Sequence, residues 1–537
     1  MTDPAAFSVA DLRVAEAVEQ ASVPPGALIQ RAAAALAAVT AGVLREHYGR
    51  VTGRQVLLLV GAGNNGADAL WAGARLAARG ARVQAVLTTA AVNGPGLAGL
   101  RAAGGTVIDL RAAGGAVIDL RAGGGPAAAS AALLRADLVI DGLVGLGGTA
   151  GLRAPAEQLV AQIPPDLPVV AVDLPSGVDP DTGATPGSHV RASVTVSFGA
   201  DKPCLLLPPG DRAAGRVVRV DLGLRPHLPV LPAVERLGVL AAASRWPVPG
   251  PTQDKYRRGV LGLVVGSTAY PGAAVLCAEG ALGAGVGMIR YLGPAPVADA
   301  VRARCPEVVA GAGRVQAWVL GSGIDPQAPD HRPDDVRAAI ATALADGRPA
   351  LLDAGALALM PDRVPAGWLL TPHAGELAVL LTGRGRPVSR EQIESCPVKY
   401  LRQAVELTGA TVLLKGATTL VAGPDGRLRS QADGSPWLAT AGSGDVLAGV
   451  AGALLAAGLP AIEAGTLAAL VHGWAGHVAS AGGPVTAAAV AAQLPAAVAA
   501  LLDAADPVAG RPDGRPAGRR RVGRRRVGRR PAARLGR

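Results

Sequence analysis

Aromatic side chains are scarce in this sequence. Only 2% of the 537 residues are Phe, Trp or Tyr, although 50% are hydrophobic. The interior must therefore be built mainly from Ala, Val and Leu, which are small or branched side chains that are often buried. A chain of this length is sufficient for two domains.

Cysteine is also rare, and long uninterrupted hydrophobic runs are missing. The four cysteines lie far apart without a C-x-x-C pair, which argues against a zinc site and against a disulfide framework. The apolar runs 446–462 and 485–505 are interrupted by Gly, Pro or Gln, so they indicate buried helices rather than membrane spans. The first residues, MTDPAAFS, have neither the basic nor the apolar region of a secretory signal, and we expect a cytoplasmic protein.

Acidic residues are almost absent from the C-terminal tail. Residues 511–537 hold twelve arginines and one acid, so this segment carries the whole formal net charge of +11 and the preceding residues are formally neutral. The tail is poor in apolar residues and repeats RRRVG, which is typical of disordered segments. Such a tail could bind nucleic acid or anionic lipid. Because it lacks interleaved aromatic residues, we favour an inert extension with no specific nucleic-acid partner and no membrane.

Lysine and asparagine are scarce as well, with four lysines against 48 arginines and three asparagines in all. Where arginine is the usual cation, a lysine indicates a position that requires a compact ammonium group. Lys202, Lys255 and Lys415 lie beside loops rich in Gly or Pro, and Asn64 and Asn65 are adjacent in another such loop. These loops are therefore candidates for binding or catalysis.

Short β-branched runs alternate with helical segments, which predicts two α/β domains in tandem with parallel sheets. The strands expected in the first half are 55–60, 82–87, 137–141, 169–173, 194–198 and 217–221. Those expected in the second half are 260–266, 317–321, 349–353, 368–370 and 411–416. The clearest helices are expected at 8–21, 26–48, 68–79, 443–457 and 461–481.

Two segments fall outside this alternation. RAAGGTVIDL at 101–110 is repeated as RAAGGAVIDL at 111–120, and we expect this local duplication to form one long peripheral loop. The proline-rich segment 225–252 predicts a connection between the domains that contains a short helix.

Several polar residues of the first half lie at expected strand ends. Asp141 and Asp173 are at the carboxyl ends of their strands, where open α/β sheets bind ligands. GAGNNGAD (61–68) follows a strand and opens a helix, and its two amides could bind phosphate or ribose or ligate a hard cation. Each loop alone could be a turn or a helix cap, but several at successive strand ends indicate one common site.

AGSGDVLAG (441–449) places a carboxylate at the start of an expected helix. The free N–H groups of a helix N-terminus without bulky side chains attract a phosphate. An acid there can take a proton from a hydroxyl that is about to meet a phosphoryl group, which is one role for Asp445. The structural alternative is that Ser443 caps the helix and Asp445 is an early-turn acid.

The loops of the first half resemble the N-terminal epimerase domain of the NAD(P)H-hydrate repair enzymes over about residues 10–225. The motifs that carry this resemblance are GAGNNGAD, DGLVGLGGTAGL, DLPSGVDPDTG and FGADKP. The resemblance implies a Rossmann-like three-layer α/β/α domain that interconverts the R and S epimers of NADH or NADPH hydrated at C6 of the nicotinamide. It implies Asp173 as the acid at the reacting ring, with Lys202 as its partner.

The same resemblance implies a potassium ion held by Asn65, Asp141 and Ser176. The residues implied to contact the hydrated dinucleotide are Asn64, Asn65, Gly66, Ala67, Asp68, Gly145, Leu146, Gly147, Gly148, Thr149, Ala150, Gly151 and Asp173. Where the family usually reads NNGGDG, this chain reads NNGADA, so Ala67 and Ala69 add methyl groups where we expect the backbone to approach the ligand. Weaker binding and a small shift of the loop are both compatible with this change.

The second half resembles the dehydratase domain of the same enzymes, which has a ribokinase-like α/β fold, over about residues 250–505. The motifs are YPGAA, LGSGI, DAGAL, LTPHAGE, LKGATT and LATAGSGDVLAGV. The resemblance implies Asp445 as the base toward the C6 hydroxyl, ADP as co-substrate and magnesium as a cofactor. The residues implied to hold the hydrated dinucleotide are Ala273, Gly323, His373 and Asp445, and those implied to bind the nucleotide are Lys415, Gly416, Ala417, Thr418, Thr419 and Gly444.

Together these features predict an epimerase domain at 1–225, a linker at 226–252, a dehydratase domain at 253–507 and a disordered tail at 508–537, in a chain expected to form a homo-oligomer. One alternative is a ribokinase-like kinase of a small metabolite such as a vitamin or sugar, for which the first domain would have no use. The other is a nucleotide-binding regulator tethered to nucleic acid by its tail.

Overall fold

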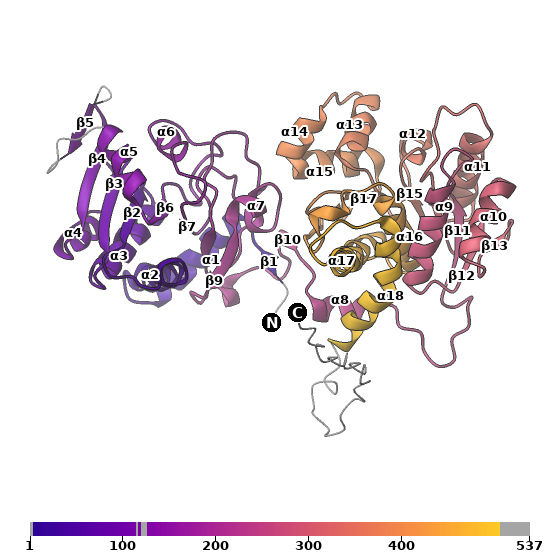
Figure 1. The fold of residues 1–537 in the computed structure, drawn as a ribbon, viewed down its shortest axis with the longest axis horizontal. Helices are drawn as coiled ribbons and strands as arrows, with labels where there is room; N and C mark the ends of the chain where they lie inside the picture. Colours follow the sequence, from indigo (N-terminus) through magenta and orange to yellow (C-terminus); the bar gives the residue numbers. More distant parts are fainter. Residues whose placement is uncertain (1–3, 114–115, 120–125, 505–537) are drawn as a thin grey trace, which may run out of the picture.

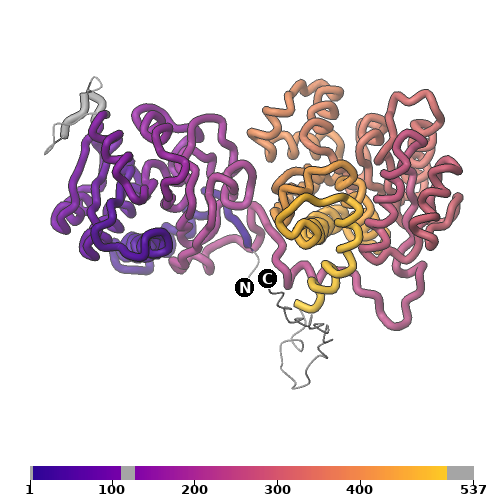
Figure 2. The backbone as a smooth tube through the Cα atoms, viewed as in Figure 1, coloured from indigo at the N-terminus to yellow at the C-terminus, as the bar shows by residue number. Residues whose placement is uncertain are grey.

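Two lobes, each built on one β-sheet, lie side by side along the long axis of the protein (Figure 1). The structure is a computed structural model that describes residues 4–113, 116–119 and 126–504. The tail expected at 508–537 lies outside the described residues. The backbone passes from the first lobe to the second through a narrow waist (Figure 2). The prediction of two tandem α/β domains is confirmed.

The first lobe is a three-layer α/β/α unit with a sheet of strand order β5-β4-β3-β2-β6-β7-β8-β9. All neighbouring pairs are parallel except β4 with β5. Helices α2, α3 and α4 cover one face, and α5 and α6 cover the other. The strands are β2 (Gln55–Val60), β3 (Arg82–Leu87), β4 (Thr106–Ala113), β5 (Ala116–Asp119), β6 (Leu138–Gly142), β7 (Val169–Val172), β8 (Val194–Phe198) and β9 (Arg216–Val220). The helices are α1 (Val9–Ser22), α2 (Ala27–Tyr48), α3 (Asn64–Ala77), α4 (Gly94–Ala102), α5 (Pro126–Arg135), α6 (Ala156–Val160) and α7 (Gly210–Ala214), with short 3-10 turns at Pro203–Leu205 and Arg225–His227.

Helix α2 is the one described helix that is long and apolar enough to cross a membrane, judged by length and composition alone. In the structure it packs against α3, and its Leu36 and Leu44 are fully buried in the core of the first lobe. Its apolar face is therefore buried inside the protein.

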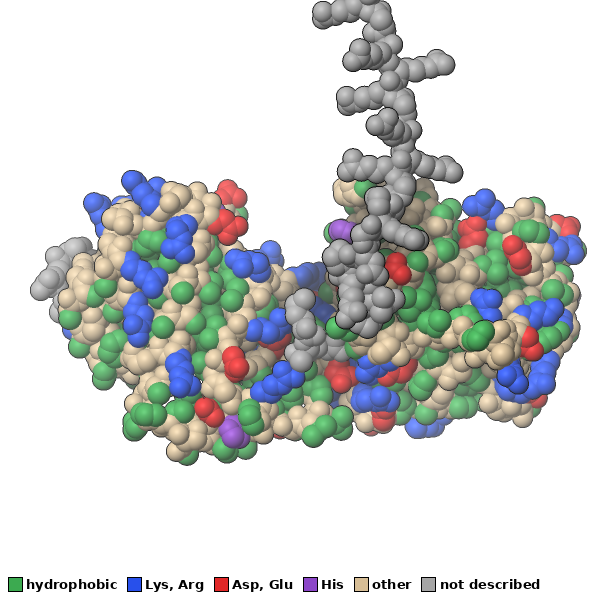
Figure 3. Space-filling view, turned by 90° about the horizontal axis from the view of Figure 1, so that it is seen from below, with side chains coloured by type: hydrophobic (Ala, Val, Ile, Leu, Met, Phe, Trp, Pro, Cys, Tyr) green, Lys and Arg blue, Asp and Glu red, His purple; other side chains and the backbone are tan. Residues whose placement is uncertain are grey.

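On the face drawn in Figure 3, positive and negative side chains both occur over the two lobes.

The duplicated segment forms strands instead of the expected peripheral loop, so that prediction is wrong for its described part. Strand β4 begins in the first copy and ends in the second, and the second copy also supplies β5, which pairs antiparallel with β4 at the edge of the sheet. In this register Ile108 faces Asp119 and Asp109 faces Ile118. The second copy supplies another short β-branched run, and its backbone extends the sheet by pairing along the free edge of β4.

The second lobe has a larger sheet of strand order β1-β10-β19-β18-β17-β16-β15-β14-β11-β12-β13. Its pairs are parallel except β1 with β10, β17 with β18 and β18 with β19. Helices α9, α10 and α16 to α18 cover one face, and α11 to α15 cover the other. The strands are β1 (Ala5–Ala6), β10 (Val234–Glu235), β11 (Val260–Val264), β12 (Met288–Tyr291), β13 (Val309–Ala310), β14 (Ala317–Leu320), β15 (Ala350–Leu352), β16 (Leu369–Leu370), β17 (Thr411–Leu414), β18 (Thr419–Ala422) and β19 (Leu428–Gln431). The helices are α8 (Val239–Arg245), α9 (Pro271–Gly283), α10 (Ala295–Arg304), α11 (Arg332–Ala345), α12 (Ala356–Leu359), α13 (Ala374–Gly383), α14 (Arg390–Ser395), α15 (Pro397–Thr408), α16 (Ser443–Ala456), α17 (Ala461–Ser480) and α18 (Ala487–Asp503), with a 3-10 turn at Pro436–Leu438.

Helices α9 and α16 approach each other closely because glycines lie where they meet. A Cβ atom added to Gly280 would lie 2.4 Å from the carbonyl oxygen of Val446, and one added to Gly449 would lie 2.1 Å from that of Cys277. Contacts at this distance leave no room for a side chain. The glycines of both helices therefore let the backbone of α16, which begins at Ser443, lie directly against that of α9.

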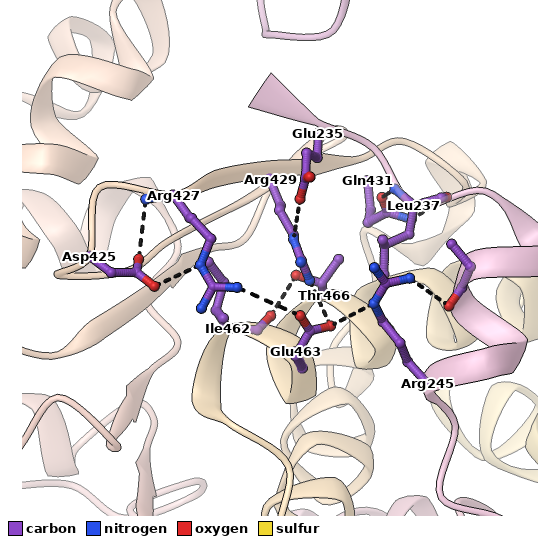
Figure 4. A network of polar contacts seen from close by, with 11 residues as sticks. Glu235, Leu237, Arg245, Asp425, Arg427, Arg429, Gln431, Ile462, Glu463 and Thr466 are labelled. Atoms are coloured by element: carbon purple, nitrogen blue, oxygen red, sulfur yellow. Dashed lines mark hydrogen bonds and ion pairs between the residues drawn. The ribbon is translucent and has the colours of Figure 1, made fainter. Parts of the chain in front are cut away.

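The segment between the lobes contributes to the second sheet. Strand β10 lies within the expected linker and pairs with β19, and the extreme N-terminal strand β1 pairs with β10. The side chain of Arg429, on β19 and 3% exposed, forms ion pairs with Glu235 on β10 at 3.0 Å and with Glu463 on α17 at 2.7 Å (Figure 4). Glu463 also pairs with Arg245 of α8 at 3.5 Å, so both elements of the linker are tied to the second lobe.

Candidate active sites

The first candidate site is a cavity of about 760 Å³ at the carboxyl ends of the strands of the first lobe. Helix α1, the start of α3, the loop after β6 and the end of β7 all contribute to its wall. The residues that line it include Arg13, Glu16, Asn64, Asn65, Asp68, Gly145, Leu146, Gly147, Gly148 and Asp173. Most of the positions implied by GAGNNGAD and DGLVGLGG are therefore brought together, as the strand-end rule predicts.

Asp173 follows β7 in a strained backbone conformation. Its φ of +70° lies in the left-handed region, which residues other than glycine adopt rarely. The carboxylate accepts a short hydrogen bond from the ammonium of Lys202 and a 3.0 Å bond from the backbone N–H of Phe198. Lys202 is fully buried and also donates to the carbonyl oxygen of Phe198 at 2.9 Å. The ammonium stabilises the negative charge of Asp173 and orients it at the cavity wall.

Two further acids share this cavity. Burial raises the pKa of Glu16, and the negative charge of Asp173 raises it further. Burial also raises the pKa of Asp68 well above its usual value, followed by the effects of Asp173 and Glu16. Asp173 thus lies beside two carboxyl groups whose pKa values are raised by burial and by neighbouring negative charge.

The three residues implied to hold potassium are adjacent in the structure. The hydroxyl of Ser176 donates to Asp141 at 2.6 Å, and the backbone N–H of Ser176 donates to the other carboxylate oxygen at 2.8 Å. The side-chain amide of Asn65 donates to the carbonyl oxygen of Val172 at 2.5 Å. Burial raises the pKa of the fully buried Asp141 to about 6. The carboxylate of Asp141, the hydroxyl of Ser176 and the carbonyl oxygen of Val144, to which Ser176 and Asn65 both donate, are oxygen ligands of the kind that a hard monovalent cation takes.

Helix α3 begins at Asn64, earlier than the sequence predicts, so the two asparagines form its first turn. Gly66 packs against the end of β2, where an added Cβ would lie 2.3 Å from the carbonyl oxygen of Gly61. Ala67 and Ala69 are buried, and the methyl group of Ala69 faces Gly142 on β6. The two methyl groups that distinguish NNGADA from NNGGDG therefore pack inside the lobe.

The rest of the glycine-rich loop leads away from the cavity. Thr149 and Ala150 follow the lining residues, and the backbone N–H of Gly151 donates to the carbonyl oxygen of Gly177 at 2.8 Å. This bond ties the end of the loop to the segment that carries Ser176.

The second candidate site lies at the N-terminus of α16. Gly442, with φ of +87°, takes the N-cap position, so the alternative in which Ser443 caps the helix is wrong. The hydroxyl of Ser443 instead lies 3.3 Å from Nε2 of His472, a buried ring whose pKa burial lowers to about 4. Burial raises the pKa of Asp445 to about 7, and the negative charge of Asp353 adds to the rise against the opposing effect of Lys415.

A network of charged groups adjoins Asp445. Nζ of Lys415 lies 2.7 Å from Asp353 and 3.5 Å from Glu376. Asp353 also accepts hydrogen bonds from the hydroxyls of Ser322 at 2.8 Å and Thr371 at 2.9 Å. Because each oxygen of Asp353 accepts a hydrogen bond, this carboxylate is held at the end of β15 with its negative charge toward Asp445 and Lys415.

The remaining implied residues surround this network. The Cβ position of Gly444 is 3.6 Å from Nζ of Lys415, and an added Cβ at Gly323 would touch the methyl group of Ala273. His373 caps α13 by accepting the N–H of Glu376 at 3.1 Å, and its exposed side chain faces solvent beside the Lys415 loop. Gly416, Ala417, Thr418 and Thr419 continue that loop from β17 to β18.

Sequence reasoning missed two residues of these sites for different reasons. Asp353 lies at the carboxyl end of β15, so the strand-end rule that selects Asp141 and Asp173 would also have selected it. Glu16 lies on α1, in a segment without a glycine loop or strand end, and no local signal points to it.

Comparison with known proteins agrees with this arrangement. A family described as NAD(P)H-hydrate dehydratase matches residues 261–495, and one described as YjeF-related protein N-terminus matches residues 25–204. The bifunctional NAD(P)H-hydrate repair enzyme Nnr of Mycobacterium tuberculosis is 43% identical over 473 residues, which cover 85% of this chain and 90% of that protein. The chain belongs to the bifunctional NAD(P)H-hydrate repair enzymes.

The enzyme of the same name from Mycobacterium leprae is likewise 43% identical over 481 residues, covering 87% of this chain and 92% of that protein. Among solved structures, the ADP/ATP-dependent NAD(P)H-hydrate dehydratase from Bacillus subtilis, co-crystallised with ATP and Mg²⁺, is similar at 24% identity and a TM-score of 0.44. The match covers 50% of this chain and 98% of the Bacillus subtilis protein.

Proposed function

We propose that this chain repairs hydrated NADH and NADPH. The first lobe interconverts the R and S epimers, and the second dehydrates the S epimer with consumption of ADP, giving AMP, phosphate and NAD(P)H. The observation that supports this most directly is Asp445, a partly buried acid with a pKa of about 7 at the N-terminus of α16, beside Lys415.

In the second lobe, Asp445 accepts the proton of the C6 hydroxyl while the oxygen attacks the terminal phosphoryl group of ADP. A base whose pKa is near neutral suits this transfer. The backbone N–H groups at Gly444 and the ammonium of Lys415 bind the phosphate charge. Phosphate leaves C6 with the push of the ring nitrogen, and loss of a proton from C5 restores the dihydropyridine. Ala273, Gly323 and His373 hold the hydrated dinucleotide.

Magnesium fits beside this network, because Glu376 provides carboxylate oxygens next to Lys415 and the proposed phosphates. The ion would neutralise phosphate charge. The phosphates of the nucleotide would be lined by Gly416, Ala417, Thr418 and Thr419. Asp353 orients Lys415 through their ion pair.

In the first lobe, Asp173 takes the proton of the C6 hydroxyl, which opens the ring between C6 and the nitrogen. Closure on the other face of the aldehyde and return of the proton give the second epimer. Lys202 holds the carboxylate of Asp173 in place for this step through its hydrogen bond, and Glu16 and Asp68 lie in the same cavity, where their carboxyl groups can form hydrogen bonds with the ligand. Potassium held by Asn65, Asp141 and Ser176 would compensate the buried negative charge.

We also propose a cytoplasmic location, consistent with four free cysteines, and a homo-oligomeric assembly. Size-exclusion chromatography with light scattering measures the assembly. The division into domains at residues 225 and 253 stays a prediction. Strands β1 and β10, which lie outside residues 253–507, extend the sheet of the second lobe.

The decisive experiment supplies mixed epimers of hydrated NADH with ADP, Mg²⁺ and K⁺. We expect the near-ultraviolet absorbance of reduced nicotinamide to recover completely, with equal amounts of AMP and free phosphate. A stable phosphorylated product without NADH would instead identify a metabolite kinase. If NADH were recovered from the S epimer alone while the R epimer stayed unconverted, the epimerase role of the first lobe would be contradicted.

A further inference from the structure

The hairpin loop between β17 and β18 is attached to both lobes. At its first residue, Nζ of Lys415 pairs with Asp353 of the second lobe at 2.7 Å, and its backbone N–H donates to the carbonyl oxygen of Pro372 at 2.9 Å. Near its other end, the hydroxyl of Thr418 donates to Oδ2 of Asp211 at 2.5 Å. Asp211 lies on α7, on the side of the first lobe that faces the second (Figure 1).

This contact is shielded from water. The side chain of Asp211 is 9% exposed, and Thr418 is 6% exposed. Within the described part of the chain, Oδ1 of Asp211 is buried without a hydrogen-bond partner, so the Thr418 hydroxyl is the hydrogen bond that satisfies this carboxylate. A hydrogen bond to a carboxylate in such surroundings is stronger than one in water, and its loss leaves the carboxylate of Asp211 with only the 3.9 Å ion pair to Arg236.

Asp211 is itself fixed in place. Its backbone N–H donates to the carbonyl oxygen of Leu207 at 2.9 Å. Arg236, from the segment after β10, lies 3.9 Å from the carboxylate and donates to the carbonyl oxygen of Leu206 at 2.9 Å and to the hydroxyl of Ser430 at 3.3 Å. The connection between the lobes thus braces Asp211 at the position where it meets the loop.

Residues 416 and 417 of the loop are exposed, whereas Thr418 is buried. A cavity of about 430 Å³ lies beside the contact, lined by Ala417 and Thr418 from the loop and by Asp211, Arg212 and Arg236 from the facing elements. Because open space adjoins the loop, the hydrogen bond between Thr418 and Asp211 is a specific contact that restricts its movement on this side.

We propose that Asp211 is a positioning residue for nucleotide binding: the first lobe holds the phosphate-contacting loop of the second through Thr418. This inference rests on the proposed function, which assigns residues 415–419 to the nucleotide. It adds a structural reason why the two lobes occur in one chain, since the dehydratase site is completed from the epimerase lobe.

The test measures steady-state dehydration by the full-length chain with purified S epimer. We expect Asp211→Ala and Thr418→Val each to raise KM for ADP about tenfold, the change that corresponds to loss of one charge-assisted hydrogen bond. KM for the hydrated dinucleotide and the epimerase rate should stay at their wild-type values. Thr418→Ser, which retains the hydroxyl, should restore KM for ADP. Asp221→Asn removes an exposed carboxylate elsewhere on the first lobe and is the matched control.

A double-mutant cycle completes the test. If the two residues act through one bond, the double variant Asp211→Ala/Thr418→Val has the KM for ADP of either single variant. Unchanged KM for ADP in the single variants, or independent effects that multiply in the double variant, would overturn the inference while leaving the proposed function intact. Failure of the wild-type chain to consume ADP would overturn both.

Discussion

Replacing Asp445 by asparagine should remove dehydratase activity and stabilise the fold above neutral pH. The activity falls because asparagine cannot accept the hydroxyl proton, and loss of a general base lowers kcat by a factor of about 10²–10⁴. Stability rises because the native carboxylate is held close to the negative charge of Asp353 and away from water. The same substitution should therefore lower kcat and raise the free energy of unfolding.

The magnitude follows from the pKa, which folding raises from 3.8 to about 7. The folded state therefore favours the protonated carboxyl, so this residue's stabilising contribution is complete below about pH 4 and is lost as the pH rises through 7. Each pKa unit corresponds to about 1.4 kcal/mol, which sets an upper bound of about 4 kcal/mol at pH 8. Since the side chain is partly exposed, we expect about 2 kcal/mol. Asparagine does not titrate and avoids this loss.

The assay is urea unfolding at pH 5 and pH 8, followed by tryptophan fluorescence, because Trp318 and Trp368 are buried in the second lobe. The stability advantage of Asp445→Asn over wild type should grow between the two pH values. Asp334→Asn, at an exposed position on α11, should show no such growth. A variant that turns over normally, or an advantage that does not depend on pH, would refute the assignment of Asp445. In the wild type, kcat/KM for dehydration should rise with pH through about 7.

Three further substitutions test the rest of the structure. Asp173→Asn should abolish epimerisation and leave the R epimer unconverted beyond its spontaneous rate, while dehydration of purified S epimer continues; chromatography of the two epimers measures this. Gly280→Ala should destabilise the second lobe by about 2 kcal/mol through overlap with α16, whereas Gly272→Ala, on the same helix but in open space, should not destabilise it. Arg429→Met should lower the free energy of unfolding by about 2 kcal/mol, because the ion pairs of a buried arginine with Glu235 and Glu463 are lost while Glu463 keeps its pair with Arg245. Arg427→Met, at a 44% exposed arginine, should change it by less than about 1 kcal/mol; urea unfolding decides both comparisons.

The hydrophobic pattern along the sequence was sufficient to predict most of the strands. The apolar runs at 55–60, 82–87 and 194–198 predict β2, β3 and β8 with the bounds observed. Strands of a parallel sheet are buried on both faces, so their hydrophobic runs are continuous and easily recognised. The duplicated segment was misjudged because a strand at the sheet edge depends on its partner, and its partner is the first copy of the same sequence.

The candidate sites were predictable where residues follow strands and glycine loops. Asp141, Asp173 and Asp445 are found in this way, because the end of a strand or the start of a helix positions them locally. Glu16 and Asp211 were not predictable. They lie on helices whose own sequences carry no sign of what they face across the molecule.

The sequence by itself determined two α/β units, the order of their motifs and the concentration of positive charge in the tail, because hydrophobic periodicity and composition are local properties. Only the tertiary structure decided that Glu16 enters the first cavity, that β10 joins the second sheet and that Asp211 reaches Thr418. It also decided the raised pKa of Asp445, because burial and the field of Asp353 arise only when distant segments come within a few ångströms of one another.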